Sequence, residues 1–244
     1  MSVNNCMSND FFEFKTFTIH QCRAAMKVGT DGVILGAWHA IGGNPKNILD
    51  IGSGTGLVAL MMAQRFPHSF VDAVEIDLDA FLDGEENISS SPYSSRIKTY
   101  HLPFQEYCAE CGKRYDVIVS NPPFFLTSLH NPNKGRAIAR HADTLPFAVL
   151  TQGASQLLSE SGVLAVVLPT ESVDTFLGDA VAAGLSLSVH TAVKTTERKN
   201  PKRHLMLFSK TLPSEIIRET VCLQNPDGSR SAWYAEMTHD FYVK

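Results

Sequence analysis

Short apolar runs alternate with longer amphipathic runs along most of the chain. The short runs, rich in apolar and β-branched residues, predict strands at residues 47–50, 69–76, 96–100, 115–120 and 163–168. The longer runs repeat with a helical period and predict helices at residues 57–66, 79–88, 145–159 and 172–183. Strands that alternate with helices in this way favour a mostly parallel sheet with helices on both faces.

The two ends of the chain extend this pattern. Residues 11–19 predict a strand or part of a small hairpin, and Thr30 or Asp31 is expected to cap a helix over residues 31–40. The same signals predict the two strands of a reversed hairpin, a tail strand and a tail helix at residues 185–193, 203–208, 215–223 and 232–241.

Together these elements predict an α/β fold. We expect a doubly wound, mostly parallel, seven-stranded sheet with a reversed last hairpin and a small N-terminal β extension. The chain should form a single domain over residues 1–244, with residues 1–40 as an extension and cap and residues 41–244 as the core.

The composition suits one globular domain that stays in the cytoplasm. Of the 244 residues, 44% are hydrophobic and 19% are charged, which allows a full core. No apolar run is long enough to cross a bilayer, and the N-terminus lacks the basic and then apolar pattern of a signal peptide. We therefore expect a cytoplasmic protein that does not associate with membranes.

Charge and cysteine content argue against two further classes of protein. The formal net charge of −4 opposes indiscriminate coating of nucleic acid, although it leaves room for a local basic patch. The five cysteines are scattered and do not suggest a disulfide framework. Cys108 and Cys111 form a CxxC pair without a second pair of ligands, so we expect ordinary thiols and no metal site.

Residues 50–56, with the sequence DIGSGTG, lie where a predicted strand ends and a helix begins. Gly52, Gly54 and Gly56 have no Cβ, so the chain can turn tightly and a ligand can lie on backbone amides there. The GxGxG spacing differs from the GxGxxG of NAD-binding proteins, which opposes a dinucleotide. Glu75 ends the next strand, where a carboxylate can bind the ribose hydroxyls of an adenosyl cofactor.

A second motif follows the strand at residues 115–120, which runs directly into NPPF at residues 121–124. DIGSGTG, VEID and NPPF resemble the motifs of class I S-adenosylmethionine (SAM) dependent methyltransferases, and NPPF resembles the subset that methylates planar nitrogens. MKVGTDGVILGAW at residues 26–38 is similar to the signature of bacterial enzymes that methylate N6 of adenosine 37 in a valine tRNA. With RHLMLF at residues 203–208 and the aromatic tail, the resemblance extends over nearly the whole chain.

The resemblance implies SAM as the cofactor and assigns residues to it. Lys27 and Thr30 would line its methionine end, with a solvated lysine and a helix cap as the alternative. Pro103 stands where many class I methyltransferases have an Asp or Asn that binds the adenine amino group. Adenine recognition would then fall to the backbone amide of Phe104, with the Phe104 ring or Ile76 packing on the base. The other expected cofactor contacts are Asp50, Gly52, Gly54, Gly56, Glu75 and Asn121.

Asn121 and Pro122 offer two carbonyl groups that could activate an exocyclic amine. Such an amine is a poor nucleophile because its lone pair is delocalised into the ring. The side-chain carbonyl of Asn121 and the backbone carbonyl of Pro122 can accept its two N–H groups and draw the nitrogen toward tetrahedral geometry. Phe124 would stack on the flipped base. Taken by itself, the tetrad could also be an ordinary strand that ends in proline.

Two predicted loops, at residues 126–143 and 194–203, carry basic side chains close to these motifs. A tRNA phosphate backbone could pass along both loops. Solvated loops carry such charges too, so a purely solvated role remains the alternative. The residues proposed as phosphate contacts are Lys134, Arg136, Arg140, Arg198, Lys199, Lys202 and Arg203.

Three other functions compete with tRNA adenine methylation. Enzymes that act on guanine N2 of ribosomal RNA, or on a glutamine amide of release factors, use the same type of tetrad. An NAD-dependent oxidoreductase would use a similar glycine turn but would leave NPPF without a role. A non-catalytic RNA-binding module is the third alternative. Residues 26–38 and the basic loop at 194–203 favour the tRNA methyltransferase.

Overall fold

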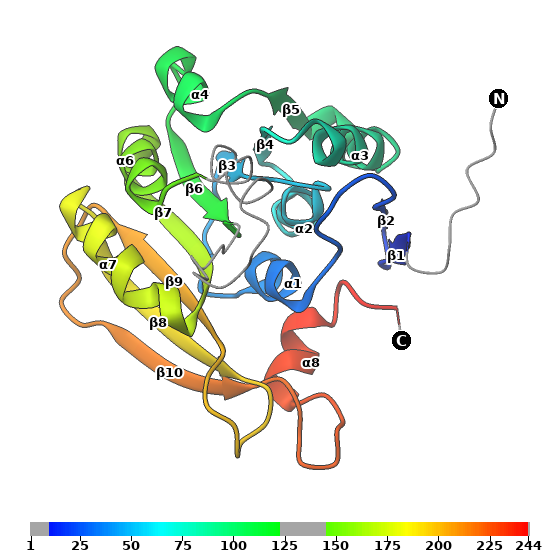
Figure 1. The fold of residues 1–244 in the computed structure, drawn as a ribbon, viewed down its shortest axis with the longest axis vertical. Helices are drawn as coiled ribbons and strands as arrows, with labels where there is room; N and C mark the ends of the chain where they lie inside the picture. Colours follow the sequence, from blue (N-terminus) through cyan, green and yellow to red (C-terminus); the bar gives the residue numbers. More distant parts are fainter. Residues whose placement is uncertain (1–9, 123–144, 244) are drawn as a thin grey trace, which may run out of the picture.

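The computed structural model describes residues 10–122 and 145–243, which contain one large sheet and one small one (Figure 1). The large sheet has eight strands in the order β10-β8-β9-β7-β6-β3-β4-β5, and β1 pairs with β2 in a separate hairpin. The strands are β1 (Phe11–Glu13), β2 (Thr18–His20), β3 (Asn47–Ile51), β4 (Phe70–Glu75), β5 (Ile97–His101), β6 (Tyr115–Ser120), β7 (Leu158–Pro169), β8 (Ser186–Lys194), β9 (Arg203–Ser209) and β10 (Ile217–Cys222).

Most neighbouring strands of the large sheet run parallel. β3 is parallel to β4 and β6, and the parallel pairing continues to β5 on one side and β7 on the other. β9 is antiparallel to both β7 and β8, which is the predicted reversed hairpin. The predicted α/β fold with a mostly parallel sheet is therefore confirmed.

The number of strands in the large sheet was predicted wrongly, as seven. The tail strand β10 adds an eighth by pairing in parallel with β8. Its six residues are exposed or half-buried, so the strand has no apolar face that would indicate where it docks. Its partner is fixed by non-local pairing, which the local pattern does not contain.

Helices cover both faces of the large sheet and enclose two hydrophobic clusters (Figure 1). One cluster lies between the sheet and α1, α2, α3 and α8, and the other lies under α4, α6 and α7. The helices are α1 (Thr30–Ala37), α2 (Leu57–Arg65), α3 (Leu78–Ser89), α4 (Phe104–Glu110), α6 (Phe147–Leu157), α7 (Val173–Ala182) and α8 (Ala232–Thr238), with short 3-10 turns η1 (Ser94–Arg96) and η2 (Thr170–Ser172).

The start of α1 differs from the expectation that Thr30 or Asp31 caps it. Gly29 is the N-cap residue, and no side chain caps the helix. Thr30 is the first helical residue, while Asp31 forms an ion pair with Arg203 of β9, with 2.6 Å between Oδ2 and Nε. A polar residue near a helix start is an ordinary capping candidate, so the distant partner of Asp31 could not be seen in the local pattern.

The two described ends of the chain pack against each other (Figure 1). Phe14, just after β1, forms an isolated bridge with Tyr242 of the tail, and their rings stack with 5.9 Å between centroids. The backbone N–H of Lys15 donates to the carbonyl of Phe241 at 2.8 Å. The N-terminal hairpin is therefore held by the C-terminal tail, whose aromatic residues dock on the core as the sequence indicates.

Candidate active site at the carboxyl edge of the sheet

The glycine turn between β3 and α2 adopts a backbone that favours glycine at three positions. Gly52, Gly54 and Gly56 have φ angles of +69°, +54° and +80°, in the left-handed region. A Cβ on Gly52 or Gly54 would meet no atom within 4 Å. The glycines at these two positions are therefore required by backbone conformation, and the main chain faces open space in which a ligand can lie.

Several amides of this turn are bonded within the protein. Gly52 and Ser53 both donate to the carbonyl of Val74, at 2.9 and 3.1 Å, and Gly54 donates to Oε2 of Glu75 at 2.7 Å. These bonds fasten the turn to the end of β4. The N–H groups of Gly52 and Gly54 therefore already have acceptors within the protein, and contact of a ligand with these two glycines stays a prediction.

Glu75 is held rigidly at the end of β4. Its Oε1 accepts the backbone N–H groups of Ile76 and Asp77, both at 2.8 Å, and the residue is only 9% exposed. An ionised carboxylate has about four lone-pair sites, of which the three amides occupy three. One site remains for a hydroxyl group, so the predicted ribose contact is still available to Glu75.

Asp50 lies at the end of β3 directly before the turn and is buried, with 1% exposure. Its Oδ2 has no hydrogen-bond partner, the only buried side-chain oxygen or nitrogen among the described residues in that situation. Burial raises the pKa of this carboxyl from 3.8 to about 7, and the nearby charge of Glu75 adds to the increase. Asp50 thus retains an unused acceptor beside the turn.

The second motif begins beside the glycine turn. Ser120 at the end of β6 is the register partner of Ile51 at the end of β3, and the Ser120 hydroxyl donates to the Ile51 carbonyl at 2.8 Å. Neighbouring strands lie about 4.8 Å apart, so Asn121 and Gly52, the next residues of the two chains, leave the sheet side by side. Asn121 is half-buried and Pro122 is buried. Phe124 lies outside the described residues.

Two further cofactor candidates, Lys27 and Ile76, differ in whether they are free to contact a ligand. The Lys27 ammonium donates to the carbonyl of Gln21 and lies 3.7 Å from Oδ1 of Asp10, so it is tied to its own segment. Ile76 is 44% exposed beside Glu75 and can contact a ligand.

The Phe104 ring was one of two side chains, with Ile76 as the other, expected to pack on the adenine, and the structure places it in the core. It is buried in the cluster under α4 and α6, where a Cβ on Gly153 would come within 2.5 Å of its Cε1. Phe104 is the first residue of α4, a helix that was not predicted, and its ring packs inward because that helix docks on α6. The Phe104 amide as an adenine contact stays a prediction.

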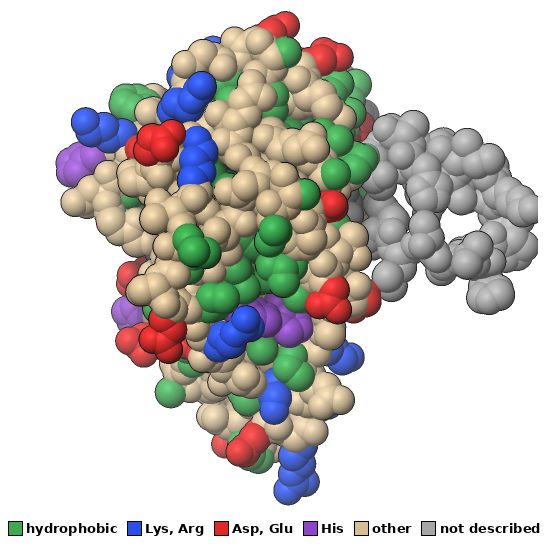
Figure 2. All heavy atoms as spheres, turned by 90° about the vertical axis from the view of Figure 1, so that its left-hand side faces the viewer, with side chains coloured by type: hydrophobic (Ala, Val, Ile, Leu, Met, Phe, Trp, Pro, Cys, Tyr) green, Lys and Arg blue, Asp and Glu red, His purple; other side chains and the backbone are tan. Residues whose placement is uncertain are grey.

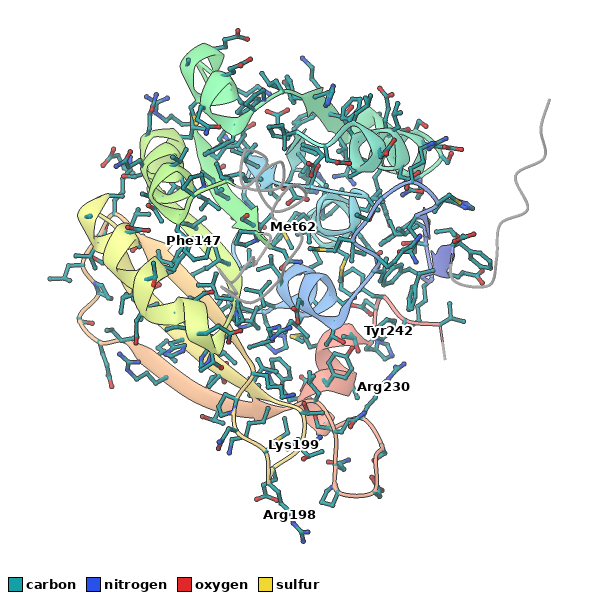
Figure 3. All side chains as sticks on the ribbon, in the orientation of Figure 1. Met62, Phe147, Arg198, Lys199, Arg230 and Tyr242 are labelled. Carbon is teal, nitrogen blue, oxygen red and sulfur yellow. The ribbon has the colours of Figure 1, made fainter. Side chains whose placement is uncertain are left out.

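The basic candidates that the structure describes lie around the loop between β8 and β9. Arg198 and Lys199 are exposed and project from its tip, and Lys202 is exposed nearby (Figure 3). Lys or Arg side chains mark the lower end of the surface in Figure 2. Arg203 has an internal partner in Asp31. The other three candidates, Lys134, Arg136 and Arg140, lie outside the described residues.

Sequence analysis missed two polar residues beside the turn, Asp83 and Asn87 of α3. Both are 1% exposed and bond backbone groups of loops. The sequence did contain a signal for them, because Asp83 and Asn87 are four residues apart and so lie on one face of the helix, the face that also carries Ile88. Polar residues at that spacing on an apolar face indicate buried hydrogen bonds.

Known proteins match both the sequence and the fold. Residues 35–174 match a family model described as Methyltransferase small domain. The tRNA1(Val) (adenine(37)-N6)-methyltransferase of Trichodesmium erythraeum is 44% identical, over 98% of this chain and 100% of that protein. The enzyme of the same name from Flavobacterium johnsoniae is 40% identical, over 96% of this chain and 99% of that protein. The chain belongs to this methyltransferase family.

Solved structures share the fold of this methyltransferase family member. A predicted O-methyltransferase from Agrobacterium tumefaciens has a TM-score of 0.66 at 15% identity, over 88% of this chain and 98% of that chain. The CcbJ methyltransferase from Streptomyces caelestis has a TM-score of 0.54 at 14% identity, over 75% of this chain and 90% of that chain. At these identities the likeness concerns the fold alone.

The described residues contain neither a membrane-spanning helix nor a cluster of metal-binding side chains. Within residues 10–122 and 145–243, no helix is long and apolar enough to cross a bilayer. The same residues contain no group of three or more His, Cys, Asp or Glu side chains that could hold a metal ion. Within the same residues, Cys108, Cys111 and Cys222 form no disulfide.

Proposed function

We propose that this protein transfers the methyl group of SAM to N6 of adenosine 37 in tRNA1(Val). The curated relatives that match almost the whole chain carry the name of this reaction. The observation that carries the proposal is the register of β3 and β6, which brings the glycine turn and Asn121 to one edge of the sheet. A cofactor on the turn and an amine held by Asn121 would then be neighbours.

The residues around the glycine turn suit a positively charged adenosyl cofactor. Gly52 and Gly54 leave open space over the main chain, and Glu75 keeps a lone-pair site for a ribose hydroxyl. Asp50 adds a carboxylate oxygen without a partner among the described residues. SAM would supply a methyl group on a positively charged sulfur, which would leave as a neutral thioether without help from a metal, and the proton released by the methylated amine would pass to solvent.

Asn121 and Pro122 would prepare the amine. The Asn121 side-chain carbonyl accepts one amine N–H, and the Pro122 backbone carbonyl accepts the other. Pro122 is suited to this task because its ring fixes φ and thereby the direction of its carbonyl. Holding both reactants in line could contribute about 7 to 11 kcal/mol to lowering the barrier. Stacking by Phe124 stays a prediction from the sequence.

The loop between β8 and β9 would bind the tRNA backbone. Arg198, Lys199 and Lys202 are exposed there, and hydrogen bonds from Leu223 to Lys194 and from Gln224 to Thr195, both 2.9 Å, hold the loop against the tail. A loop fixed in this way can present its cations to phosphate groups without losing much conformational entropy on binding. A cytoplasmic site of action remains a prediction from the sequence.

Labelled SAM and total tRNA that lacks the modification test this function. We expect N6-methyladenosine at position 37 of tRNA1(Val) after incubation with the protein, as detected by nuclease digestion and mass spectrometry. Label in ribosomal RNA or in protein instead would assign the chain to a different substrate. Absence of label from every substrate, with SAM bound, would argue for a non-catalytic RNA-binding protein.

Asn121→Ala tests the catalytic assignment in the same assay. Removing one of two acceptors should reduce turnover by at least about 100-fold, as is typical when a transition-state hydrogen bond is lost. SAM affinity, measured by calorimetry, should change little, because the amide acts on the amine. Near wild-type turnover in this variant would refute the role given to Asn121.

A further inference from the structure

Residues 20–29, from the last residue of β2 to the residue before α1, are here called the strap. The side chain of Asn87, on α3, bonds both backbone groups of His20, the first residue of the strap, as a neighbouring strand would. The Asn87 Oδ1 accepts the backbone N–H of His20, and its Nδ2 donates to the carbonyl of His20, both at 2.8 Å. The same Nδ2 donates to the carbonyl of Thr55, in the glycine turn, at 3.0 Å. One buried amide therefore connects the strap to the turn.

Asp83 holds the next part of the strap from one helical turn earlier. Its Oδ2 accepts the backbone N–H groups of Arg23 and Ala24, at 2.9 and 2.8 Å. Its Oδ1 accepts a hydrogen bond from the Arg23 guanidinium at 2.8 Å. Asp83 and Asn87 are both 1% exposed and lie four residues apart, so they share one face of α3.

The same face of α3 supports the glycine turn directly. A Cβ on Gly84 would lie 2.7 Å from the carbonyl oxygen of Gly54, so only glycine fits at that contact. A Cβ on Gly56 would lie 3.1 Å from Cδ1 of Ile88. The helix surface formed by residues 83, 84, 87 and 88 therefore touches the turn and the strap at once.

We propose that Asp83 and Asn87 are positioning residues that hold the strap beside the glycine turn, so that the strap forms a second part of the cofactor site. This inference rests on the proposed function. The strap leads into Thr30 at the start of α1, so its position also sets where α1 begins. Beyond His20, which pairs with Phe11 in the β1–β2 hairpin, neither the strap nor the glycine turn belongs to a strand ladder, so buried side-chain hydrogen bonds fix them instead.

Asn87→Asp is the sharpest test because the side chain keeps its size. It replaces an N–H donor with an oxygen that faces the carbonyls of His20 and Thr55, so the connection between strap and turn is lost. We expect the dissociation constant for SAM, measured by calorimetry, to rise about tenfold, equivalent to about 1.4 kcal/mol. The kcat at saturating SAM should stay within about twofold of wild type.

The matched control is Glu86→Gln on the same helix. Glu86 also contacts the Arg23 guanidinium, at 3.0 Å, but its side chain is 60% exposed and bonds no strap backbone. Exposed ion pairs contribute little, so SAM affinity should remain within about twofold. Asp83→Asn weakens the hydrogen bonds that Asp83 accepts from the strap amides of Arg23 and Ala24. It should therefore raise the dissociation constant for SAM as Asn87→Asp does.

Amide hydrogen exchange on the wild-type protein gives a test that needs no variant to fold. The amides of His20, Arg23 and Ala24 should exchange more slowly when saturating SAM is added, because the cofactor would close the strap against the turn. Unchanged exchange at these amides, or unchanged SAM affinity in Asn87→Asp and Asp83→Asn, would overturn the positioning role. Failure to methylate tRNA despite tight SAM binding would instead overturn the proposed reaction.

Discussion

Asp50→Asn tests whether the buried carboxyl beside the glycine turn is protonated in the folded protein. Its pKa is raised from 3.8 to about 7, first by burial and then by the charge of Glu75. Between these two values the unfolded chain has released the proton while the folded protein keeps it. The free energy of unfolding of the wild type therefore falls as pH rises, by ~1.4 kcal/mol per pH unit from this group alone.

Over the whole window the contribution of Asp50 amounts to ~4 kcal/mol at most, since the shift spans about three pH units. Asparagine does not titrate, so the stability of Asp50→Asn minus that of wild type should grow between pH 4 and 7 and stay constant above. Any cost of burying the new amide is independent of pH and leaves this change unaffected.

Urea denaturation of the ligand-free proteins at half-unit pH steps and constant ionic strength measures this difference. Asp79→Asn removes an exposed carboxylate and serves as the matched control for the loss of one negative charge. Equal differences between Asp50→Asn and wild type at pH 5 and pH 7.5 would refute the reasoning, because Asp50 would then be ionised in the folded protein at its ordinary pKa.

Three further changes test other parts of the structure. Gly84→Ala should lower the free energy of unfolding by about 1–3 kcal/mol in urea denaturation, because the new Cβ collides with backbone and outweighs the gain in helix propensity. Burial lowers the pKa of His190 and of His204 below 6.5, so stability should fall as pH drops below that value, and less so when both are glutamine. The double variant Arg198→Ala, Lys199→Ala should have a several-fold higher KM for tRNA and an unchanged SAM affinity. An unchanged KM would show that the tip of the loop between β8 and β9 does not bind RNA.

The two motifs could be located from sequence because their structure is set locally. Three glycines after an apolar run require a turn with positive φ, and the turn is found at Gly52, Gly54 and Gly56. Strand ends in a parallel sheet meet at one edge, so DIGSGTG and NPPF could be expected to be neighbours. The Ile51 and Ser120 register bears this out.

Long-range partners could not be predicted in the same way. Asp31 and Arg203 were interpreted separately, as a helix cap and a phosphate contact, and the structure joins them in an ion pair across most of the chain. The Phe104 ring or Ile76 was expected to pack on the adenine, and the Phe104 ring packs against Gly153 instead. In each case the local sequence allows two roles, and only the tertiary contact selects one of them.

The polar residues around the glycine turn have structural roles beside the ligand contacts that the motifs predict. Glu75, Asp83 and Asn87 all bond backbone groups of loops that lack a strand ladder, so their first role is to hold those loops in place. A ligand can use only the lone pairs that remain. By that criterion Glu75, which already accepts three amides, offers a ligand one lone-pair site, and Asp50, which is 1% exposed, offers its Oδ2, which has no partner among the described residues.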